Sequence, residues 1–235
     1  MATPTTVLKT WIDAGSRTFF LDVFLRRLKT EDINQVVEIE KEAFSPLWVS
    51  TPFKRELNNQ YACYLVACPD EETAEAVRSE TQESTGRPLW ERLARSVNGA
   101  IGRPPKPPAA EEFVAGYVSV WYQGQEAHIT EIAVRERLRG RGIGELLLIG
   151  SMREAVKYGS QVMTLEARVS NFIAQRLYEK YAFKTVGTRK GYYSDNREDA
   201  VIMTTCPIDT EEYQQVFQGL QDTYTNRWGE IQFDG

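Results

Sequence analysis

The feature that most constrains this chain is a glycine-rich stretch, RLRGRGIGELLL, that runs from Arg137 to Leu148. It follows a segment rich in apolar residues, ITEIAV, and leads into an apolar run, so it is expected to join a strand to a helix. Glycine loops in such positions bind phosphate groups. The backbone can come close to the anion there, and the free N–H groups of the first helical turn point at it.

Two common phosphate loops do not fit the spacing of these glycines. A dinucleotide loop needs G-x-G-x-x-G, and the third glycine position counted from Gly140 falls on Glu145. A nucleoside triphosphate loop needs a lysine and then serine or threonine after its last glycine. Here Glu145 and Leu146 follow Gly144, so the lysine for the γ-phosphate is missing.

The remaining pattern is R-x-x-G-x-G, formed by Arg139, Gly142 and Gly144. Arg139 and Arg141 add positive charge beside the glycines. This arrangement favours a diphosphate that is held by backbone amides and arginine without a metal. The alternative is an ordinary tight turn that happens to be rich in glycine.

A second constellation lies in LEARVSNFIAQRLYEKYAF, from Leu165 to Phe183. Glu166 interrupts an otherwise apolar strand pattern, where a carboxylate is costly unless it meets water, a cation or a substrate. Asn171 is placed to begin the next helix, and Tyr178 follows two helical turns later on roughly the same face. Both side chains can therefore face a ligand at the helix start. The alternative is that Glu166 is a surface residue of a strand and Tyr178 a core aromatic.

Composition and charge narrow the classes of function. Hydrophobic residues make up 42% and charged residues 26% of the chain, which is typical of a globular protein. The net charge of −5 argues against broad binding to nucleic acid or to an anionic membrane, and agrees with a cationic substrate. The only histidine is His128, so a zinc site or a serine–histidine triad has little to be built from.

The expected location is the cytoplasm. The three cysteines, Cys63, Cys68 and Cys206, lack metal-ligand spacing and are expected to be reduced thiols. No segment reaches the roughly 18 apolar residues of a membrane span. Charged residues interrupt the apolar runs at the N-terminus, which makes it a poor signal peptide.

Strand and helix patterns alternate along the chain and predict a mixed α/β fold of three layers, a central mixed sheet with helices on both faces. Strands are expected over 23–28, 61–68, 162–169, 184–193 and 198–205. Residues 113–134 are expected to form a hairpin of two strands that turns at 123–125. Helices are expected over 33–44, within 53–59, over 144–159 with Gly159 just after its end, over 172–183, and after Asp209, which forms a capping-box-like start with Glu212.

Residues 23–205 are expected to form one domain, preceded by an N-terminal extension over 1–22 and followed by a C-terminal helical extension over 206–235. A polar, proline-rich insertion over 69–112 interrupts the domain. We interpret it as a solvated spacer, or alternatively as an element that binds a partner. One short amphipathic helix, PLWERLARSV, is expected within it.

The two constellations together resemble the GCN5-related N-acetyltransferase (GNAT) family, and within it the bacterial enzymes that acetylate the N-terminal alanine of a ribosomal protein. The segments that carry the resemblance are EAHITEIAVRERLRGRGIGELLL, LEARVSNFIAQRLYEKYAFKTVGTRKGYY and EDAVIMTT. The likeness covers residues 23–68 and 113–205.

The resemblance implies that acetyl-CoA is the co-substrate and lies in a V-shaped opening between the ITEIAV and VMTLEARV strands. The backbone of Ile132, Ala133 and Val134 would pair with the pantetheine arm, and Asn171 would contact that arm near the thioester. The diphosphate would lie on Gly140, Arg141, Gly142, Ile143, Gly144 and Glu145, beside Arg139. Glu166 matches the family's general base and Tyr178 its general acid; no metal takes part.

Two departures from the family pattern stand out. Arg135 and Glu136 replace the usual acidic residue and proline after the strand. Ala182 replaces the usual glycine before Phe183, and an alanine in a left-handed cap costs about 1 kcal/mol.

The chemistry that the residues support is transfer of an acetyl group to an α-amine. A free α-amine has a pKa near 7.7–8.0, against about 10.4 for lysine, so far more of it is neutral and nucleophilic at pH 7. A carboxylate such as Glu166 can remove the remaining proton, and a strand amide, that of Val134, can stabilise the oxyanion. Tyr178 can protonate the departing thiolate if it is held close.

We expect Arg189, Tyr192 and Tyr193 to form a wall over the acceptor's N-terminus, because an aromatic pair is awkward in a loop between strands. The alternative is packing of this loop onto the core. The expected acceptor is the N-terminus of a protein, with a small-subunit ribosomal protein as the leading partner. Lysine side chains or small-molecule amines are the second possibility, and a non-catalytic acetyl-CoA-binding module is the third.

Overall fold

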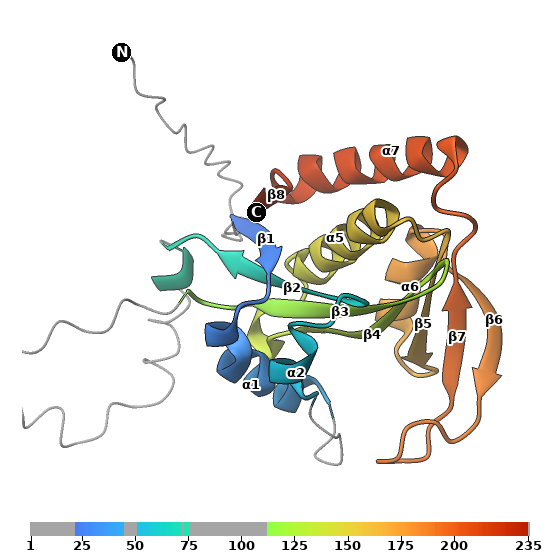
Figure 1. The fold of residues 1–235 in the computed structure, drawn as a ribbon, viewed down its shortest axis with the longest axis horizontal. Helices are drawn as coiled ribbons and strands as arrows, with labels where there is room; N and C mark the ends of the chain where they lie inside the picture. Colours follow the sequence, from blue (N-terminus) through green and yellow to red (C-terminus); the bar gives the residue numbers. More distant parts are fainter. Residues whose placement is uncertain (1–21, 45–50, 72, 76–111, 235) are drawn as a thin grey trace, which may run out of the picture.

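The structure, a computed structural model, describes residues 22–44, 51–71, 73–75 and 112–234. These residues form one mixed eight-stranded sheet with helices on both faces, which confirms the predicted fold class (Figure 1). The strand order is β6-β7-β5-β4-β3-β2-β1-β8. The strands are β1 (Val23–Arg27), β2 (Ala62–Pro69), β3 (Gly116–Gln123), β4 (Glu126–Val134), β5 (Val162–Arg168), β6 (Lys184–Arg189), β7 (Ala200–Thr204) and β8 (Gln232–Asp234).

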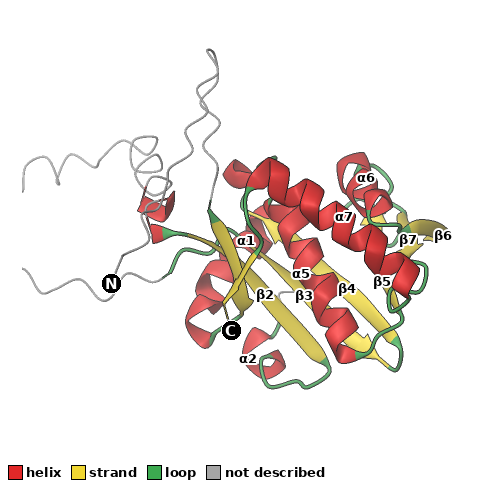
Figure 2. Cartoon of the chain, turned by 90° about the horizontal axis from the view of Figure 1, so that it is seen from above, coloured by secondary structure: helices red, strands yellow, loops and turns green. Residues whose placement is uncertain are grey.

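The helices divide the core into two clusters, one on each face of the sheet. On one face lie α5 (Ile143–Tyr158), α6 (Phe172–Lys180) and α7 (Glu211–Trp228), whose apolar side chains join the larger cluster. On the other face lie α1 (Ile33–Ala43) and α2 (Phe53–Glu56), which pack on the smaller cluster. Figure 2 shows α7 lying along α5, so this face carries a second layer of helix.

Local sequence signals explain several of these elements. In α1, Val36 and Ile39 lie three residues apart on one apolar face of the helix, and both are fully buried. The hairpin of β3 and β4 turns at Gly124, which has a positive φ of 57°. Helix α5 ends at Gly159, which takes the predicted left-handed conformation.

The C-terminal segment differs from its prediction in two ways. The N-cap of α7 is Thr210 and not Asp209, because the Thr210 hydroxyl accepts a hydrogen bond from the backbone N–H of Tyr213. After α7 the chain adds β8, which the sequence analysis did not predict and which pairs in parallel with β1. The alternation of Ile231 and Phe233 was its only signal.

Several predictions concern parts of the chain that lie outside the described residues. They include almost all of the expected N-terminal extension, the helix PLWERLARSV and most of the 69–112 insertion. Where the insertion begins, Ala74 is buried and packs against the larger core cluster.

Candidate functional site

The neighbouring parallel strands β4 and β5 part in the middle of the sheet. They pair over only four positions, from Glu126 with Val162 to Ile129 with Leu165. Beyond Ile129, β4 continues with pairing to β3, and beyond Leu165, β5 continues with pairing to β7. We call the space that opens between residues 130–134 and 166–168 the strand opening. The pairing of β4 with β5 therefore ends at the strands between which the family resemblance implied a V-shaped gap.

The backbone of β4 turns unpaired groups toward the strand opening. The N–H of Arg135 donates to the carbonyl of Ala115 at 2.9 Å, on the β3 side. Backbone groups alternate in direction along a strand, so the N–H and C=O groups of Ile132 and Val134 point the other way, toward β5. The Val134 carbonyl accepts a hydrogen bond from Nε of Arg139 at 3.3 Å. The N–H groups of Ile132 and Val134 can therefore donate to a molecule in the strand opening.

The glycine loop has the conformation that an anion site needs. Gly140 and Gly142 have φ values of 77° and 79°, and α5 begins directly after Gly142. The N–H groups at the start of α5 have no partner inside the helix. Within the described residues, the side chain of Arg141 forms no ion pair, and that of Arg139 bonds only to the Val134 carbonyl. The loop therefore presents amides and free positive charge together.

The negative charge of Glu145, in the first turn of α5, does not repel an anion at the glycine loop. Its carboxylate accepts hydrogen bonds from Nζ of Lys180 at 2.5 Å and from the hydroxyl of Tyr181 at 2.8 Å. The negative charge is thus paired with a cation and turned toward the end of α6. These observations fit the diphosphate of a coenzyme at this loop.

Glu166 lies on β5 at the first position beyond the pairing with β4. Its side chain is 7% exposed and makes two contacts, both at 3.1 Å. One is from Oε2 to Nε2 of His128 on β4, and the other is from Oε1 to the guanidinium of Arg189 at the end of β6. The carboxylate that the sequence singled out is therefore largely covered by its neighbours, contacts two side chains and lies at the strand opening.

A chain of hydrogen bonds orients the imidazole of His128. The Thr164 hydroxyl donates to Glu126 at 2.6 Å, so its single hydrogen is used. Nδ1 of His128, 2.7 Å from the same hydroxyl oxygen, must then donate to it. Nε2, on the other side of the ring, lies 3.1 Å from Oε2 of the Glu166 carboxylate. His128 and Glu166 thus contact each other where β4 and β5 part, and His128 is a member of the site that the sequence alone did not single out.

Tyr178 comes from α6, on the opposite face of the sheet to α1 and α2. Its side chain is 6% exposed and its ring lies 5.8 Å from that of Phe183, centroid to centroid. The hydroxyl bonds to no other described residue, and it is not among the fully buried unpaired atoms. Burial raises the pKa of Tyr178 above its usual value, so the hydroxyl stays protonated at neutral pH. The ring packs in the core, while its hydroxyl proton is free to be donated.

Asn171 caps α6 as predicted. Its side-chain oxygen accepts a hydrogen bond from the backbone N–H of Ala174 at 3.2 Å. The residue is exposed, so its amide nitrogen remains available to a ligand. The expected alignment with Tyr178 on one face is only partial, because Asn171 is exposed and Tyr178 is buried.

The loop between β6 and β7 gathers the predicted acceptor residues beside Glu166. The Arg189 guanidinium, which contacts Glu166, also lies 5.6 Å from the ring centre of Tyr192. Tyr192 is 45% exposed and packs edge-on against Tyr193. Burial and the nearby Glu166 carboxylate raise the pKa of Tyr192. These three side chains therefore form a continuous patch with the carboxylate.

Ion pairs and hydrogen bonds hold this loop in place. Arg168 on β5 pairs with Asp195 at 2.8 Å and with Glu198 at 3.2 Å, and its guanidinium lies 3.9 Å from the ring centre of Tyr193. Hydrogen bonds from Ser170, then from Asn196 and Arg168, lower the pKa of Glu198 to about 2. The loop therefore presents Tyr192 from a fixed backbone.

A second buried carboxylate, Glu131, faces the α1 and α2 side of β4. It accepts hydrogen bonds from the hydroxyls of Thr51 at 2.6 Å and Tyr117 at 2.8 Å. Burial raises the pKa of Glu131. The sequence alone does not single out Glu131, because a bulge opposite Ser119 and Val120 shifts the alternation of β4 and turns this side chain toward α1 and α2.

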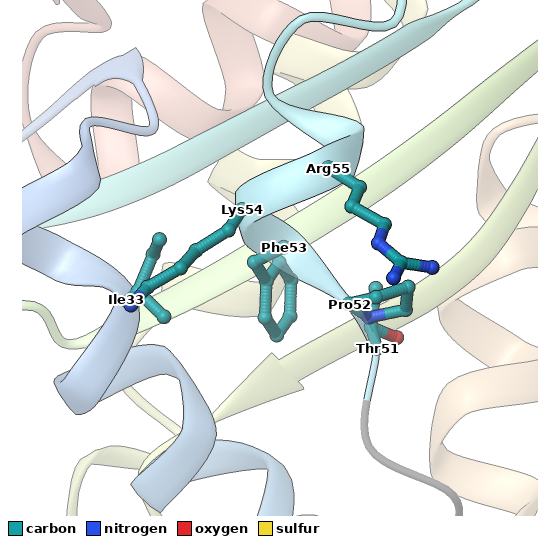
Figure 3. A pocket seen from close by; sticks show the side chains of 6 residues that line it. All are labelled: Ile33, Thr51, Pro52, Phe53, Lys54 and Arg55. Atoms are coloured by element: carbon teal, nitrogen blue, oxygen red, sulfur yellow. The ribbon is translucent and has the colours of Figure 1, made fainter.

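An open pocket of about 500 Å³ lies beside Thr51, between the start of α1 and α2. Figure 3 shows Phe53 between Lys54, which reaches toward Ile33, and Arg55, which extends the other way. The lining residues are Ile33, Thr51, Pro52, Phe53, Lys54 and Arg55.

The described residues contain no group of three or more histidine, cysteine or acidic side chains that could hold a metal. The same part of the chain has no helix with the length and hydropathy of a membrane span.

Residues 33–183 match the model of the acetyltransferase (GNAT) family. A Bacillus subtilis relative, provisionally named as a ribosomal protein bS18-alanine N-acetyltransferase, is 32% identical over 180 residues, which cover 76% of this chain and 92% of the relative.

Two solved structures show the same fold. One is the crystal structure of the ribosomal-protein-S18-alanine N-acetyltransferase of Escherichia coli, with a TM-score of 0.56 and 23% identity over 80% of this chain and 95% of that one. The other is a Bacillus anthracis protein, provisionally named as a streptothricin acetyltransferase, in complex with acetyl coenzyme A. Its TM-score is 0.54, with 15% identity over 79% of this chain and 99% of that one.

Proposed function

Because the chain belongs to the GNAT family of acetyltransferases, we propose that it moves the acetyl group of acetyl-CoA to the α-amine of a protein N-terminus. The acceptor is the N-terminal alanine of a small-subunit ribosomal protein. The name of the Bacillus subtilis relative, which this chain matches over 92% of that relative's length, supports this choice. Ribosomal proteins are made in the cytoplasm, and we place the reaction there.

The donor binds along β4 and the glycine loop. The N–H groups at residues 140–145 receive the diphosphate, and Arg139 and Arg141 balance its charge. The backbone of Ile132, Ala133 and Val134 runs beside the pantetheine arm, with donors from Ile132 and Val134 directed into the strand opening. Asn171 meets the same arm from the start of α6.

The amine is activated at the pair of His128 and Glu166, and this pair is the observation that carries the proposal. An α-ammonium group loses its proton near pH 8. The Glu166 carboxylate is the proton acceptor at this point, beside the imidazole of His128, whose Nε2 lies 3.1 Å from Oε2. An ammonium group, or a water that relays its proton, donates to that point and leaves a neutral nucleophile.

The remaining residues complete the transfer. The N–H of Val134 donates to the carbonyl oxygen of the acetyl group as negative charge develops there. The hydroxyl of Tyr178 donates the hydrogen bond through which the departing thiolate takes up a proton. Arg189 and Tyr192, with Tyr193 behind them, border the acceptor's first residue on the β6–β7 side.

A panel of acceptors tests this function. One short peptide carries a free N-terminal alanine, a second carries the same sequence with a blocked N-terminus and an internal lysine, and a third acceptor is a polyamine. Release of coenzyme A is measured with each, and mass spectrometry locates the acetyl group. We expect acetylation of the free alanine peptide only. Acetylation of the lysine or the polyamine while the free peptide is ignored would instead assign the site to those amines. Binding of acetyl-CoA without turnover of any acceptor would assign a binding module.

A further inference from the structure

The C-terminal helix ends on the glycine loop. Trp228 is the last residue of α7, and a Cβ atom added to Gly142 would lie 2.7 to 2.9 Å from three carbons of its indole ring. The indole therefore rests directly on the backbone of Gly142, at the start of α5. Only glycine leaves room for this contact. Helix α7 lies outside residues 33–183, the part of the chain that matches the family model.

Both ends of this contact are held in place. Tyr213, Phe217 and Tyr224 anchor α7 in the larger core cluster, each with at most 5% of its surface exposed. Just beyond Trp228, β8 pairs with β1, which fixes the chain that follows the tryptophan. The core packing of α7 and the pairing of β8 with β1 therefore hold Trp228 against the glycine loop.

Arg227 lies beside Trp228, near the glycine loop, and its positive charge is not paired with a described residue. Its guanidinium carbon lies 4.8 Å from the centre of the Trp228 indole. The side chain is exposed, and within the described residues it forms no ion pair and no hydrogen bond. An arginine in the last turn of a helix often bonds to the terminal carbonyls, but this one is stacked on the ring instead. The nearby Asp22 carboxylate lies beside Gly229 and does not pair with Arg227.

Coenzyme A has more negative charge than the glycine loop alone can match. Besides the diphosphate, its ribose carries a 3′-phosphate, a monoester with close to two negative charges at neutral pH. The loop amides with Arg139 and Arg141 serve the diphosphate. A guanidinium is the side chain best suited to a phosphate monoester, because it can form two parallel hydrogen bonds.

We propose that Arg227 and Trp228 extend the donor site to the nucleotide end of coenzyme A, with Arg227 binding the 3′-phosphate. The inference rests on the proposed function, because it requires coenzyme A on the glycine loop. Trp228 holds the guanidinium beside that loop. The C-terminal helix is in this way a part of the donor site.

Calorimetric titration of the full chain with coenzyme A and with 3′-dephospho-coenzyme A tests the proposal. We expect Arg227→Gln to weaken binding of coenzyme A roughly tenfold and to leave binding of the dephospho form unchanged. Arg227→Lys should keep part of the affinity, because the charge remains. Lys41→Gln, which removes one exposed positive charge from α1, is the matched control and should leave both affinities unchanged.

Each other outcome overturns the proposal. If Arg227→Gln weakens the binding of both ligands equally, the arginine contributes only to the overall surface charge or contacts the diphosphate, and it does not bind the 3′-phosphate. If it weakens neither, Arg227 does not contact the donor. If the unmodified chain binds neither ligand, the proposed function itself fails, and this result is distinct from a defect confined to the variant.

Discussion

Nε2 of His128 lies 3.1 Å from Oε2 of Glu166, and the two residues come from the strands that part at the strand opening. The hydrogen bonds from His128 to Thr164 and from Thr164 to Glu126 orient the imidazole so that Nε2 faces the carboxylate. On its other oxygen, Glu166 contacts the guanidinium of Arg189 at 3.1 Å. The proposed general base is therefore held between two side chains.

Glu166→Gln should lower kcat by a factor of about 10² to 10⁴, because the amide cannot take the proton of the acceptor amine. The affinity for acetyl-CoA should not change, since the proposed mechanism places Glu166 beside the acceptor amine and not on the donor. Steady-state kinetics with an alanine peptide and a titration with coenzyme A measure the two effects. Glu179→Gln, an exposed change on α6, is the control. Unaltered kcat in Glu166→Gln would remove Glu166 from the chemistry.

His128→Gln should also lower kcat, and the double variant His128→Gln with Glu166→Gln should be no slower than the poorer single variant. His128 contacts Glu166 directly, and the effects of two residues that act through one another do not add. The measurement is a double-mutant cycle on kcat at saturating peptide. Multiplication of the two single effects in the double variant would show that His128 acts independently of Glu166.

Tyr178→Phe should reduce kcat by about 10² while the variant folds and binds acetyl-CoA normally, because the hydroxyl bonds to no described residue. Burial holds the pKa of Tyr178 above that of a free tyrosine, so the acid stays protonated. The kcat of the unmodified chain should therefore not fall from pH 8 to about pH 10 through loss of this proton. Tyr224→Phe on α7 is the control for loss of a core hydroxyl.

Much of the fold was predictable because its signals are local. The caps at Asn171 and Gly159, the glycine turn of the hairpin and the apolar face of α1 depend on residues within one or two turns of each other. The glycine loop and Glu166 were likewise singled out from short motifs. The structure shows α5 beginning directly after Gly142 and Glu166 lying one residue beyond the β4–β5 pairing.

The residues that were missed depend on contacts between distant segments. His128 meets Glu166 only because the register of two parallel strands sets residue 128 beside Thr164. Glu131 faces inward because of a bulge that no sequence pattern marks. Trp228 reaches Gly142 through the packing of α7 on α5. None of these relationships follows from spacing along the chain, since each requires the packed sheet and helices.

Tyr192→Ala should raise the KM for the peptide while kcat stays within about twofold, because Tyr192 is half exposed and touches Arg189 at the edge of the site. Peptide kinetics and a thermal melt separate this effect from a loss of stability. Tyr61→Ala, another exposed aromatic that lies before β2, is the control. A KM that changes no more than in the control would limit Tyr192 to packing of its loop.

Ala182 lies in the left-handed region with a φ of 64°, just after the end of α6. The N–H of Phe183 donates to the Tyr178 carbonyl and the N–H of Ala182 donates to that of Glu179, which together form a Schellman motif. The rings of Phe183 and Tyr178 complete the motif with a contact of 5.8 Å between centroids. The cap that Ala182 closes therefore positions the proposed general acid, at the expense of an unfavourable backbone conformation.

Ala182→Gly should relieve this strain and raise the free energy of unfolding by about 1 kcal/mol, less the greater chain entropy of glycine in the unfolded state. For a chain of this size, the gain corresponds to a rise in Tm of about 2–4 °C. Ala174→Gly, in the right-handed interior of α6, is the matched control and should lower Tm, because glycine is a poor helix former. The kcat of Ala182→Gly should be unchanged, since the Schellman bonds that hold Tyr178 involve only the backbone. A lower Tm in Ala182→Gly would show that the methyl group of Ala182 contributes more through packing than the left-handed conformation costs.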